Sequence, residues 1–470
     1  MTPPSLPPDV FDRLPAEAQA YIRYLEARVG QFETRLAELE GRLKQNSSNS
    51  SKPPSSDAPS VKPAPPKKPT GNRRGGQPGH PKRTRPTLPP DVIVELRAEA
   101  CDRCAHPLSG TDPQPLCHQV FELPPVRPHV TEYRRHRLTC PHCRRVTCPA
   151  LPPDARGGYG PRVEAVCAVL SGAYRVGKRG VARLMGDLFG LPISPAAVCD
   201  LQHQTAAALG PVAAAAHAHV VGKPANVDET GWREGRQRAW LWVAVTACVT
   251  VFLIRLSRGR KVLRELIPGT PGVLTTDRYP AYHHLAADRR QVCWAHLRRD
   301  FQAMIDRGNG GTPIGKQLLA LADDLLGQWK RVRDGTLTRR RFVSHHLGGI
   351  RAGVYVLLRR GRVCPCVKTA GVCRELLARV GTLYTFAAVG GVEPTNNAAE
   401  RALRHAVCWR RTSYGTDSAT GSRFVERVLT AVASCRQQGR DVLALLTTTI
   451  QAARTGGAAP SLIPASAASP

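Results

Sequence analysis

The chain has 470 residues, which is too long for a single hydrophobic core and leaves room for two or three domains. Its 67 lysines and arginines outnumber its 36 aspartates and glutamates, and the formal charge of +31 makes nucleic acid the leading class of partner. With no run of about 18 apolar residues and no secretory start, we expect a soluble cytoplasmic protein and no membrane partner. The fifteen cysteines therefore suggest thiols and metal ligands rather than disulfides.

A coiled coil is predicted within residues 1–46. Apolar residues recur there at alternating steps of three and four, at Ile22, Leu25, Val29, Phe32, Leu36, Leu39 and Leu43. Mixed charges occupy the intervening positions, as on the solvated flanks of such a seam. We expect a homo-oligomer formed through this helix; the alternative is an amphipathic helix that packs on its own chain.

Residues 47–90 are rich in Ser, Pro and Gly and predict a disordered linker. No acidic residue lies between Asp57 and Asp91. The basic residues of this stretch are Lys62, Lys67, Lys68, Arg73, Arg74, Lys82, Arg83 and Arg85. Such a block can follow DNA phosphates, although a merely solvated linker explains the composition equally well.

Residues 91–150 predict a small zinc module, with β-like runs such as 92–94. Two chelating pairs, Cys101 with Cys104 and Cys140 with Cys143, supply the four thiolates of one tetrahedral structural Zn²⁺ site. Because the span between the pairs is long, two unrelated pairs of reduced cysteines are the alternative. The possible substitute ligands are His106, Cys117, His142 and Cys148. Five nearby arginines are candidates for phosphate contacts: Arg134, Arg135, Arg137, Arg144 and Arg145.

Helices are predicted at 161–174, 179–189 and 194–209. Ser194 is suited to cap the third of these and Pro195 to open it. Gly190 and Pro192 break the chain before it. The segment 156–215 thus resembles a helix-turn-helix that binds DNA, although three packed helices occur in many domains.

An α/β pattern follows, with strands predicted at 225–228, 240–247, 249–256, 272–277 and from 291 to 294. A helix at 260–266 and another between the last two strands give the element order of a ribonuclease H-like core. Its first part is 222–307, a helical insertion covers 308–391, and the final part, 392–454, opens on a helix capped by Thr395 or Asn396. The tail 455–470 is predicted to be disordered.

Three carboxylates are candidates for catalysis: Asp228 and Asp277 at strand ends, and Glu400 early in a late helix. Three carboxylates from different elements can hold two Mg²⁺ ions. Such a pair of ions allows water or a 3′-hydroxyl to attack a phosphodiester. Taken singly, each residue has an ordinary explanation. Asp228 would be a strand-end turn residue, Asp277 an Asx turn, and Glu400 the ion-pair partner of Arg404.

The blocks around these acids resemble transposases of the insertion sequence 66 family. The matching segments are VDETGWR (227–233), TDRY (276–279), CWAHLRRDF (293–301) and NNAAER (396–401). Further similar segments are QNSSNSSKPP (45–54), GGQPGH (75–80), the four-cysteine module and CRQQGR (435–440). Their shared order along most of the chain is more specific than any single motif.

The resemblance implies a ribonuclease H-like catalytic domain, two Mg²⁺ ions held by Asp228, Asp277 and Glu400, and recognition of the element's terminal inverted repeats. Cys293 and His296 match a pair found between the second and third acids of related transposases. With Arg401 and Arg404, they are candidates for supporting the acids or contacting DNA; a buried strand cysteine and a helix-start histidine are the alternative. Glu229 and Asp300 are acids that could be mistaken for ligands. In the zinc module the chain departs from the family, because no glycine follows either cysteine pair.

We therefore expect a multidomain α/β transposase that hydrolyses element ends and joins the freed 3′-hydroxyl to target DNA. One alternative is a zinc and helix-turn-helix regulator with an inactive catalytic fold. Another is a nuclease that hydrolyses DNA without strand transfer.

Overall fold

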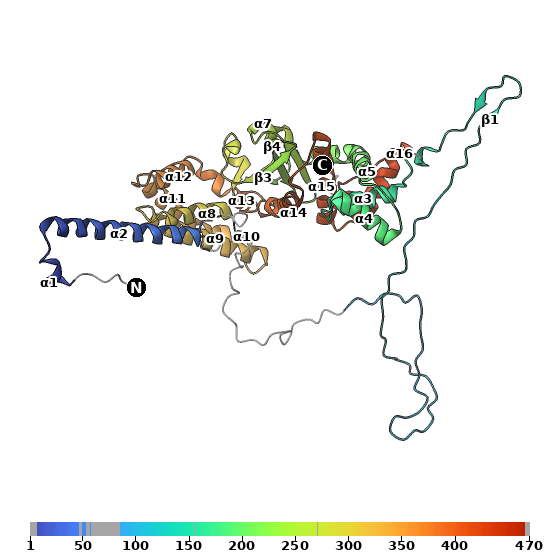
Figure 1. The fold of residues 1–470 in the computed structure, drawn as a ribbon, viewed down its shortest axis with the longest axis horizontal. Helices are drawn as coiled ribbons and strands as arrows, with labels where there is room; N and C mark the ends of the chain where they lie inside the picture. Colours follow the sequence, from blue (N-terminus) through green and yellow to red (C-terminus); the bar gives the residue numbers. More distant parts are fainter. Residues whose placement is uncertain are drawn as a thin grey trace.

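The computed structural model describes residues 7–46, 49–52, 57, 85–155, 157–269 and 271–465. Most of the basic segment predicted at 47–90, including GGQPGH (75–80), lies outside the described residues, as do the last five residues of the tail. No helix in the described ranges is long and apolar enough to span a bilayer. Figure 1 shows a compact body with α2 at one end and a long extended segment at the other.

The N-terminal helix predicted from the apolar spacing is present as α2 (Ala16–Leu43), preceded by the short α1 (Pro8–Phe11). Asn49 closes the end of α2, since its Oδ1 accepts from Asn46 N (2.7 Å) and its Nδ2 donates to the Lys44 carbonyl (3.0 Å). Most of the predicted seam is exposed, with Leu36 59% exposed. The helix is therefore confirmed, and self-association stays a prediction.

The extended segment 85–155 contains little regular structure. Its two strands, β1 (Leu138–Thr139) and β2 (Val146–Thr147), form one small antiparallel hairpin. The predicted β-run at 92–94 was wrong: these residues are in no strand and their side chains are exposed, because no neighbouring strand pairs with them.

Four helices then form a bundle: α3 (Pro161–Gly172), α4 (Lys178–Phe189), α5 (Pro195–Ala208) and α6 (Gly210–Val220). As predicted, Ser194 caps α5, its Oγ accepting from Ala197 N at 3.1 Å. The sequence interpretation missed α6. The bundle is tied to the C-terminal helix α16 (Val442–Thr455), because buried Glu164 accepts from Arg454 Nη2 at 2.6 Å.

The central sheet has the strand order β5-β4-β3-β6-β7. Its strands are β3 (Ala225–Glu234), β4 (Gln237–Val245), β5 (Thr250–Arg255), β6 (Leu274–Thr276) and β7 (Arg290–Val292). The first three pair antiparallel, whereas β6 is parallel to β3 and β7 is parallel to β6. The chain is thus a mixed α/β protein, as expected.

Two predictions about this sheet were wrong. β3 runs on to Glu234, so Asp228 lies inside a strand rather than at its end, because β4 pairs with it along its full length. No long helix joins β6 to β7; two 3-10 turns, Pro280–Tyr282 and Ala287–Arg289, replace it. The first turn is anchored by Tyr282, which is fully buried and donates its hydroxyl to Glu229.

Helices cover both faces of the sheet. α14 (Asn397–Ser413) packs on β3 and β4, and α7 (Arg260–Leu266) packs on β4 and β5. Figure 1 places α7 and α14 on opposite sides of the sheet. After α8 (Trp294–Asp306), the helical insertion forms its own core around Trp294, Trp329, Phe342 and Phe386.

The insertion begins with α9 (Thr312–Arg333) and α10 (Arg339–Arg341). A π-helical turn, Phe342–His346, joins α10 to α11 (Leu347–Gly361), and α12 (Val367–Ala378) and α13 (Thr385–Ala388) complete it. This stretch is mainly helical, as predicted, and its assignment as an insertion in a ribonuclease H-like core stays a prediction.

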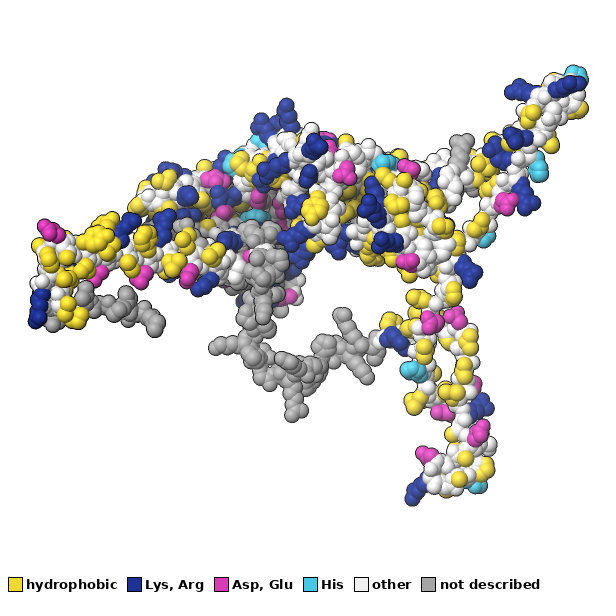
Figure 2. All heavy atoms as spheres, in the orientation of Figure 1, with side chains coloured by type: hydrophobic (Ala, Val, Ile, Leu, Met, Phe, Trp, Pro, Cys, Tyr) yellow, Lys and Arg dark blue, Asp and Glu magenta, His cyan; other side chains and the backbone are white. Residues whose placement is uncertain are grey.

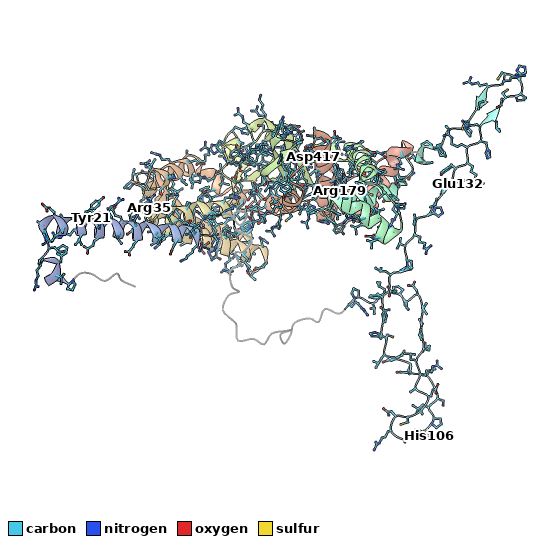
Figure 3. The ribbon with its side chains drawn as sticks, in the orientation of Figure 1. Tyr21, Arg35, His106, Glu132, Arg179 and Asp417 are labelled. Atoms are coloured by element: carbon cyan, nitrogen blue, oxygen red, sulfur yellow. The ribbon has the colours of Figure 1, made fainter. Side chains whose placement is uncertain are left out.

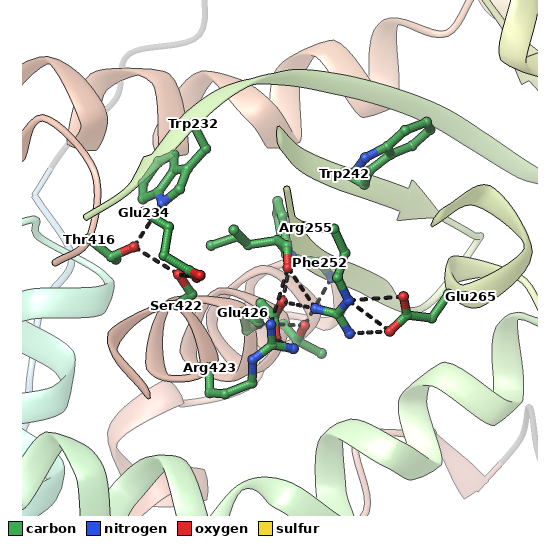
Figure 4. Close-up of polar contacts among 12 residues, drawn as sticks. Trp232, Glu234, Trp242, Phe252, Arg255, Glu265, Thr416, Ser422, Arg423 and Glu426 are labelled. Carbon is green, nitrogen blue, oxygen red and sulfur yellow. Dashed lines mark hydrogen bonds and ion pairs between the residues drawn. The ribbon is translucent and has the colours of Figure 1, made fainter. Parts of the chain in front are cut away.

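Helix α15 (Ala419–Gln438) covers the edge strand β5 with hydrogen-bonding side chains. Thr250 N donates to Ser434 Oγ (3.1 Å), Phe252 N to Thr430 Oγ1 (3.1 Å) and Ile254 N to the Glu426 carboxylate. Four residues of helix rise about 6 Å, and two residues of strand rise about 6.6 Å. Every fourth side chain of α15 therefore meets every second N–H group of β5. An edge that would otherwise expose unpaired N–H groups is closed in this way. Figure 4 shows how Arg255 joins Glu426 and Glu265 beside it.

The CRQQGR segment clasps the β4–β5 turn. Gln437 Nε2 donates to the Thr246 carbonyl and Gln438 Nε2 to the Cys248 carbonyl, both at 2.7 Å. Gln438 also donates to the Leu462 carbonyl, and Leu462 is 1% exposed. The described part of the tail predicted to be disordered, residues 455–465, packs on the body instead, because Leu462 buries its side chain against the core.

Thr430→Val tests the edge-strand contact. The substitution keeps the shape of the side chain but leaves the buried Phe252 N–H without an acceptor, so the free energy of unfolding should fall by about 1–3 kcal/mol. Thr448→Val is the matched control, since exposed Thr448 donates only to the Ala444 carbonyl of its own helix. Thermal unfolding of the full chain should show a lower Tm for Thr430→Val alone. Equal midpoints for both variants would contradict the assigned contact.

Candidate active site

The pairing register of the parallel strands places Asp228 and Asp277 side by side. Ala225 pairs with Leu274 and Asn226 with Thr275, so continuing this register brings Asp277 level with Asp228. Neighbouring strands lie about 4.8 Å apart, and level residues of parallel strands point to the same face. The two aspartates, 49 positions apart in sequence, therefore meet on one face of the sheet.

Alternation along β3 separates Asp228 from the adjacent Glu229. Thr230 and Trp232, which share the face of Asp228, contact Arg410 and Thr416 near the end of α14. Glu229 faces the other side, where it pairs with Arg258 (2.7 Å) and accepts from Tyr282. The Glu229 carboxylate is therefore bound to Arg258 and Tyr282 on the opposite face, and Asp228 is the acid that faces α14.

Glu400 reaches this face from the first turn of α14. The residue that follows β7 fixes the start of α14. Thr276 pairs with Val292, so continuing the register by one residue brings Asp277 level with Cys293. Cys293 is 0% exposed, and its Sγ accepts from Asn396 N, just before α14, at 3.3 Å. Burial raises the pKa of the Cys293 thiol to about 12, so it remains protonated. Cys293 thus connects the level of the two aspartates to the helix that carries Glu400.

Helix α8 provides two further neighbours of Glu400. Arg299 Nη2 lies 3.3 Å from Glu400 Oε1, and His296 Nδ1 lies 3.6 Å from the same oxygen. Burial and the nearby Arg299 charge lower the pKa of His296 to about 3, so the imidazole is neutral and the contact is no ion pair. Sequence interpretation missed Arg299, although its position one turn after His296 is a usable signal.

Asp277 is held by its own turn and lies beside the ion-pair network of Arg278. Its Oδ1 accepts from Tyr279 N at 2.9 Å, which is the Asx turn considered above. Arg278 points elsewhere and pairs with Asp300 and Glu375, both at 2.7 Å. Asp300 therefore has a basic partner, and Asp277 is the acid left beside Asp228.

The electrostatics of Asp228 are those of a crowded carboxylate. Burial raises its pKa well above the usual value, and the negative charges of Glu229, Asp277 and Glu400 raise it further. Its carboxylate accepts a hydrogen bond from the backbone N–H of Glu229, at 2.9 Å. A cation bound at this position would remove the repulsion between these acids.

These residues fit hard divalent cations in donor type, since all three acids supply carboxylate oxygens. Asn226 adds a buried Oδ1 without a partner, two residues before Asp228 on the same face. Within the described ranges, no three His, Cys, Asp or Glu side chains already surround one point, and Arg299 occupies the side of Glu400. Asp228, Asp277 and Glu400 therefore match such cations in donor type.

Comparison with known proteins identifies the family. The model of the Transposase IS66 family matches residues 156–423, which is more than half of the chain and includes all three acids. The chain belongs to this family. A family of unknown function, DUF6444, matches residues 5–86. The chain is also similar to the uncharacterized protein y4qI of Sinorhizobium fredii (strain NBRC 101917 / NGR234), with 26% identity over 239 residues. That match covers 45% of this chain and 43% of the relative, so the chain spans less than half of that relative.

The cysteine pairs lie outside the part that matches the IS66 family. Each pair forms a tight turn: Ala105 N donates to the Cys101 carbonyl and Arg144 N to the Cys140 carbonyl. Ala105 and Arg144 adopt φ of 54° and 59°, the conformation a glycine after the second cysteine would favour. Backbone N–H groups lower the pKa of Cys101 and of Cys140.

The two turns are far apart along the extended segment. Figure 3 places His106, beside the first turn, at the lower end of this segment, and Figure 1 places β1, beside the second, at its upper end. The structure therefore forms two separate cysteine turns and does not bring the four thiols together.

Basic side chains line the exposed parts of the IS66-family region. Arg401 and Arg404 are exposed on α14, directly after Glu400. In the helical segment, α5 carries no Lys or Arg and packs against α3, α4, α15 and α16. The exposed basic residues lie instead around the start of α4, at Arg175, Lys178, Arg179 and Arg183. Figure 2 shows Lys and Arg side chains gathered over the middle of the body, around the position of α14.

Proposed function

We propose that this IS66-family chain is a DNA transposase that hydrolyses the ends of its element and joins the freed 3′-hydroxyl to target DNA. The observation that carries the proposal is the level arrangement of Asp228 and Asp277 on β3 and β6, with Glu400 on the helix above. Two Mg²⁺ ions would activate the attacking oxygen and stabilise the leaving oxygen at a phosphodiester. Asp228 and Asp277 hold one side of that site rigidly, and Glu400 closes it from α14.

The sheet supports a ribonuclease H-like core for the catalytic domain. Three antiparallel strands followed by two parallel ones, in the order β5-β4-β3-β6-β7, match the order expected for that fold. We propose the division stated from the sequence: coiled coil, basic linker, zinc module, helical DNA-binding segment, interrupted core and tail.

Cys293, His296 and Arg299 would act as positioning residues. Cys293 binds the backbone before α14, while neutral His296 and charged Arg299 contact Glu400. Arg299 neutralises Glu400 in the absence of a cation and would release it when one binds.

DNA, including the terminal inverted repeats, would lie against the exposed arginines rather than against α5. A helix without Lys or Arg whose apolar side is packed offers little to a phosphate backbone, whereas the residues around the start of α4 and on α14 do. We therefore propose that α4 and α14 form the principal DNA contacts.

Asp277→Ala tests the catalytic proposal. Loss of a direct ligand should reduce Mg²⁺-dependent cleavage and joining by more than the roughly 100-fold typical of outer-shell substitutions, while DNA binding is kept. Asp288→Ala, an exposed acid between β6 and β7, is the control. The assay uses DNA carrying the repeats that flank the gene and detects both cleaved ends and joined products. Normal joining by folded Asp277→Ala would refute the proposal. Cleavage without joining by the wild type would favour a nuclease. A wild type that neither cleaves nor joins DNA would favour a regulator.

We also propose that Cys101, Cys104, Cys140 and Cys143 bind one structural Zn²⁺ by bringing the two cysteine turns together. Both turns have the backbone form of a zinc-binding knuckle, and their backbone N–H groups favour thiolate at Cys101 and Cys140. Purified full-length protein should contain about one zinc per chain. Cys140→Ser should lose it, whereas Cys408→Ser, at an exposed position on α14, should keep it. A metal analysis that finds no zinc in wild type would contradict the site.

Self-association through α2 is proposed from its exposed seam, since an isolated helix of this kind gains stability only by burying its apolar residues. Leu36→Lys should reduce the mass measured by light scattering. Thr34→Lys adds the same charge on the outer side of the helix and should leave the mass unchanged. An unaltered mass for Leu36→Lys would exclude the seam as the interface.

A further inference from the structure

Tyr414 combines two features that do not favour folding. It follows α14 directly with φ of 59° and ψ of 5°, a left-handed conformation that a bulky side chain rarely adopts. Its side chain is 76% exposed, so little packing offsets the strain. Glycine or asparagine would serve the backbone better, and the aromatic ring must therefore be useful outside the fold.

The loop that presents Tyr414 is rigid. Thr416 N donates to the Arg233 carbonyl (2.9 Å) and Gly235 N to the Thr416 carbonyl (2.7 Å), which joins the loop to the β3–β4 turn. Trp232 Nε1 donates to Thr416 Oγ1 at 3.2 Å, a contact visible in Figure 4. Gly415 admits no side chain, because an added Cβ would lie 2.3 Å from the Arg233 carbonyl oxygen. The ring is thus carried on a fixed base.

A stripe of arginines leads from the catalytic acids to this ring. Arg401, Arg404 and Arg411 are exposed on α14, with exposed Cys408 between them, at steps of three and four residues. They lie on one side of the helix, which starts beside Glu400 and ends at Tyr414. The helix rises 1.5 Å per residue, so Tyr414 lies about 20 Å from Glu400, or about six nucleotide steps of 3.4 Å.

We propose that Tyr414 stacks on an unpaired base of the DNA that follows the arginine stripe, about six nucleotides from the phosphate at the catalytic acids. The proposal rests on the DNA-processing function proposed above. Arginines contact the backbone phosphates, whereas an exposed ring offers a π-face that matches a base. Bases in a closed duplex are already stacked on one another, so the contacted base must have left the stack.

The first test is photo-crosslinking of the full-length protein to its flanking repeats. Single thymines within about ten nucleotides of the cleavage site are replaced by 5-iodouracil, which crosslinks to an aromatic ring stacked on it. Mass spectrometry should find the crosslink on the peptide that contains Tyr414, strongest about six nucleotides from the site. A crosslink pattern that does not include this peptide would overturn the proposal.

Two variants separate stacking from structure. Tyr414→Phe should keep both affinity and crosslink, whereas Tyr414→Asn, which tolerates the left-handed conformation, should bind about 5- to 150-fold more weakly. The Tm of Tyr414→Asn should equal or exceed that of wild type. The salt dependence of its affinity should be unchanged, while Arg404→Gln should lower that slope by about one.

Tyr355→Gln is the matched control, because Tyr355 is an exposed tyrosine with Arg359 near its ring on a helix remote from the stripe. It should behave as wild type. Normal DNA affinity in Tyr414→Asn, or a Tm loss that accounts for its defect, would refute stacking while leaving the transposase proposal standing. Absence of DNA binding by wild type would instead refute both, and Asp277→Ala should bind and crosslink normally.

Discussion

The parallel register of β3, β6 and β7 is the constraint on which the site depends. Continued by one or two residues, this pairing brings Asp228, Asp277 and Cys293 to one level, although these residues are far apart in the chain. A shift of one residue in β6 would turn Asp277 to the opposite face, because side chains alternate along a strand. The same level also fixes α14, since Cys293 binds the backbone at Asn396. The strand register and the position of α14 therefore depend on each other in this fold.

Gathering acidic side chains around this level of the sheet opposes folding, and neighbouring arginines limit that cost. Glu229 is neutralised by Arg258, Asp300 by Arg278, and Glu400 is contacted by Arg299. Asp228 and Asp277 have no such basic partner among the described residues, and burial together with acidic neighbours raises the pKa of Asp228. A divalent cation, as proposed above, would relieve the repulsion that remains.

The β5 edge of the sheet is covered by a helix, α15, rather than by another strand. Side chains of α15 satisfy alternate N–H groups of β5, and Gln437 and Gln438 clasp the turn that precedes it. The CRQQGR segment therefore has a structural role at the β4–β5 turn. It lets the sheet end at β5 while the helical bundle packs behind α15.

Local sequence determined most elements: the α2 helix from its apolar spacing, the Ser194 cap, the helix at 260–266 and the strand predicted at 272–277, which spans Leu274–Thr276. Motif order also singled out the three acids and the family. Only tertiary structure decided which face each acid occupies, that Asp228 lies within a long strand, that 3-10 turns replace a helix after β6, and that Leu462 orders the tail. The roles inferred for Arg299 and Tyr414 could be recognised only from neighbours that are distant in sequence. The physical reason is that propensity acts over a few residues, whereas strand pairing, burial and ion pairing join residues that the chain holds far apart.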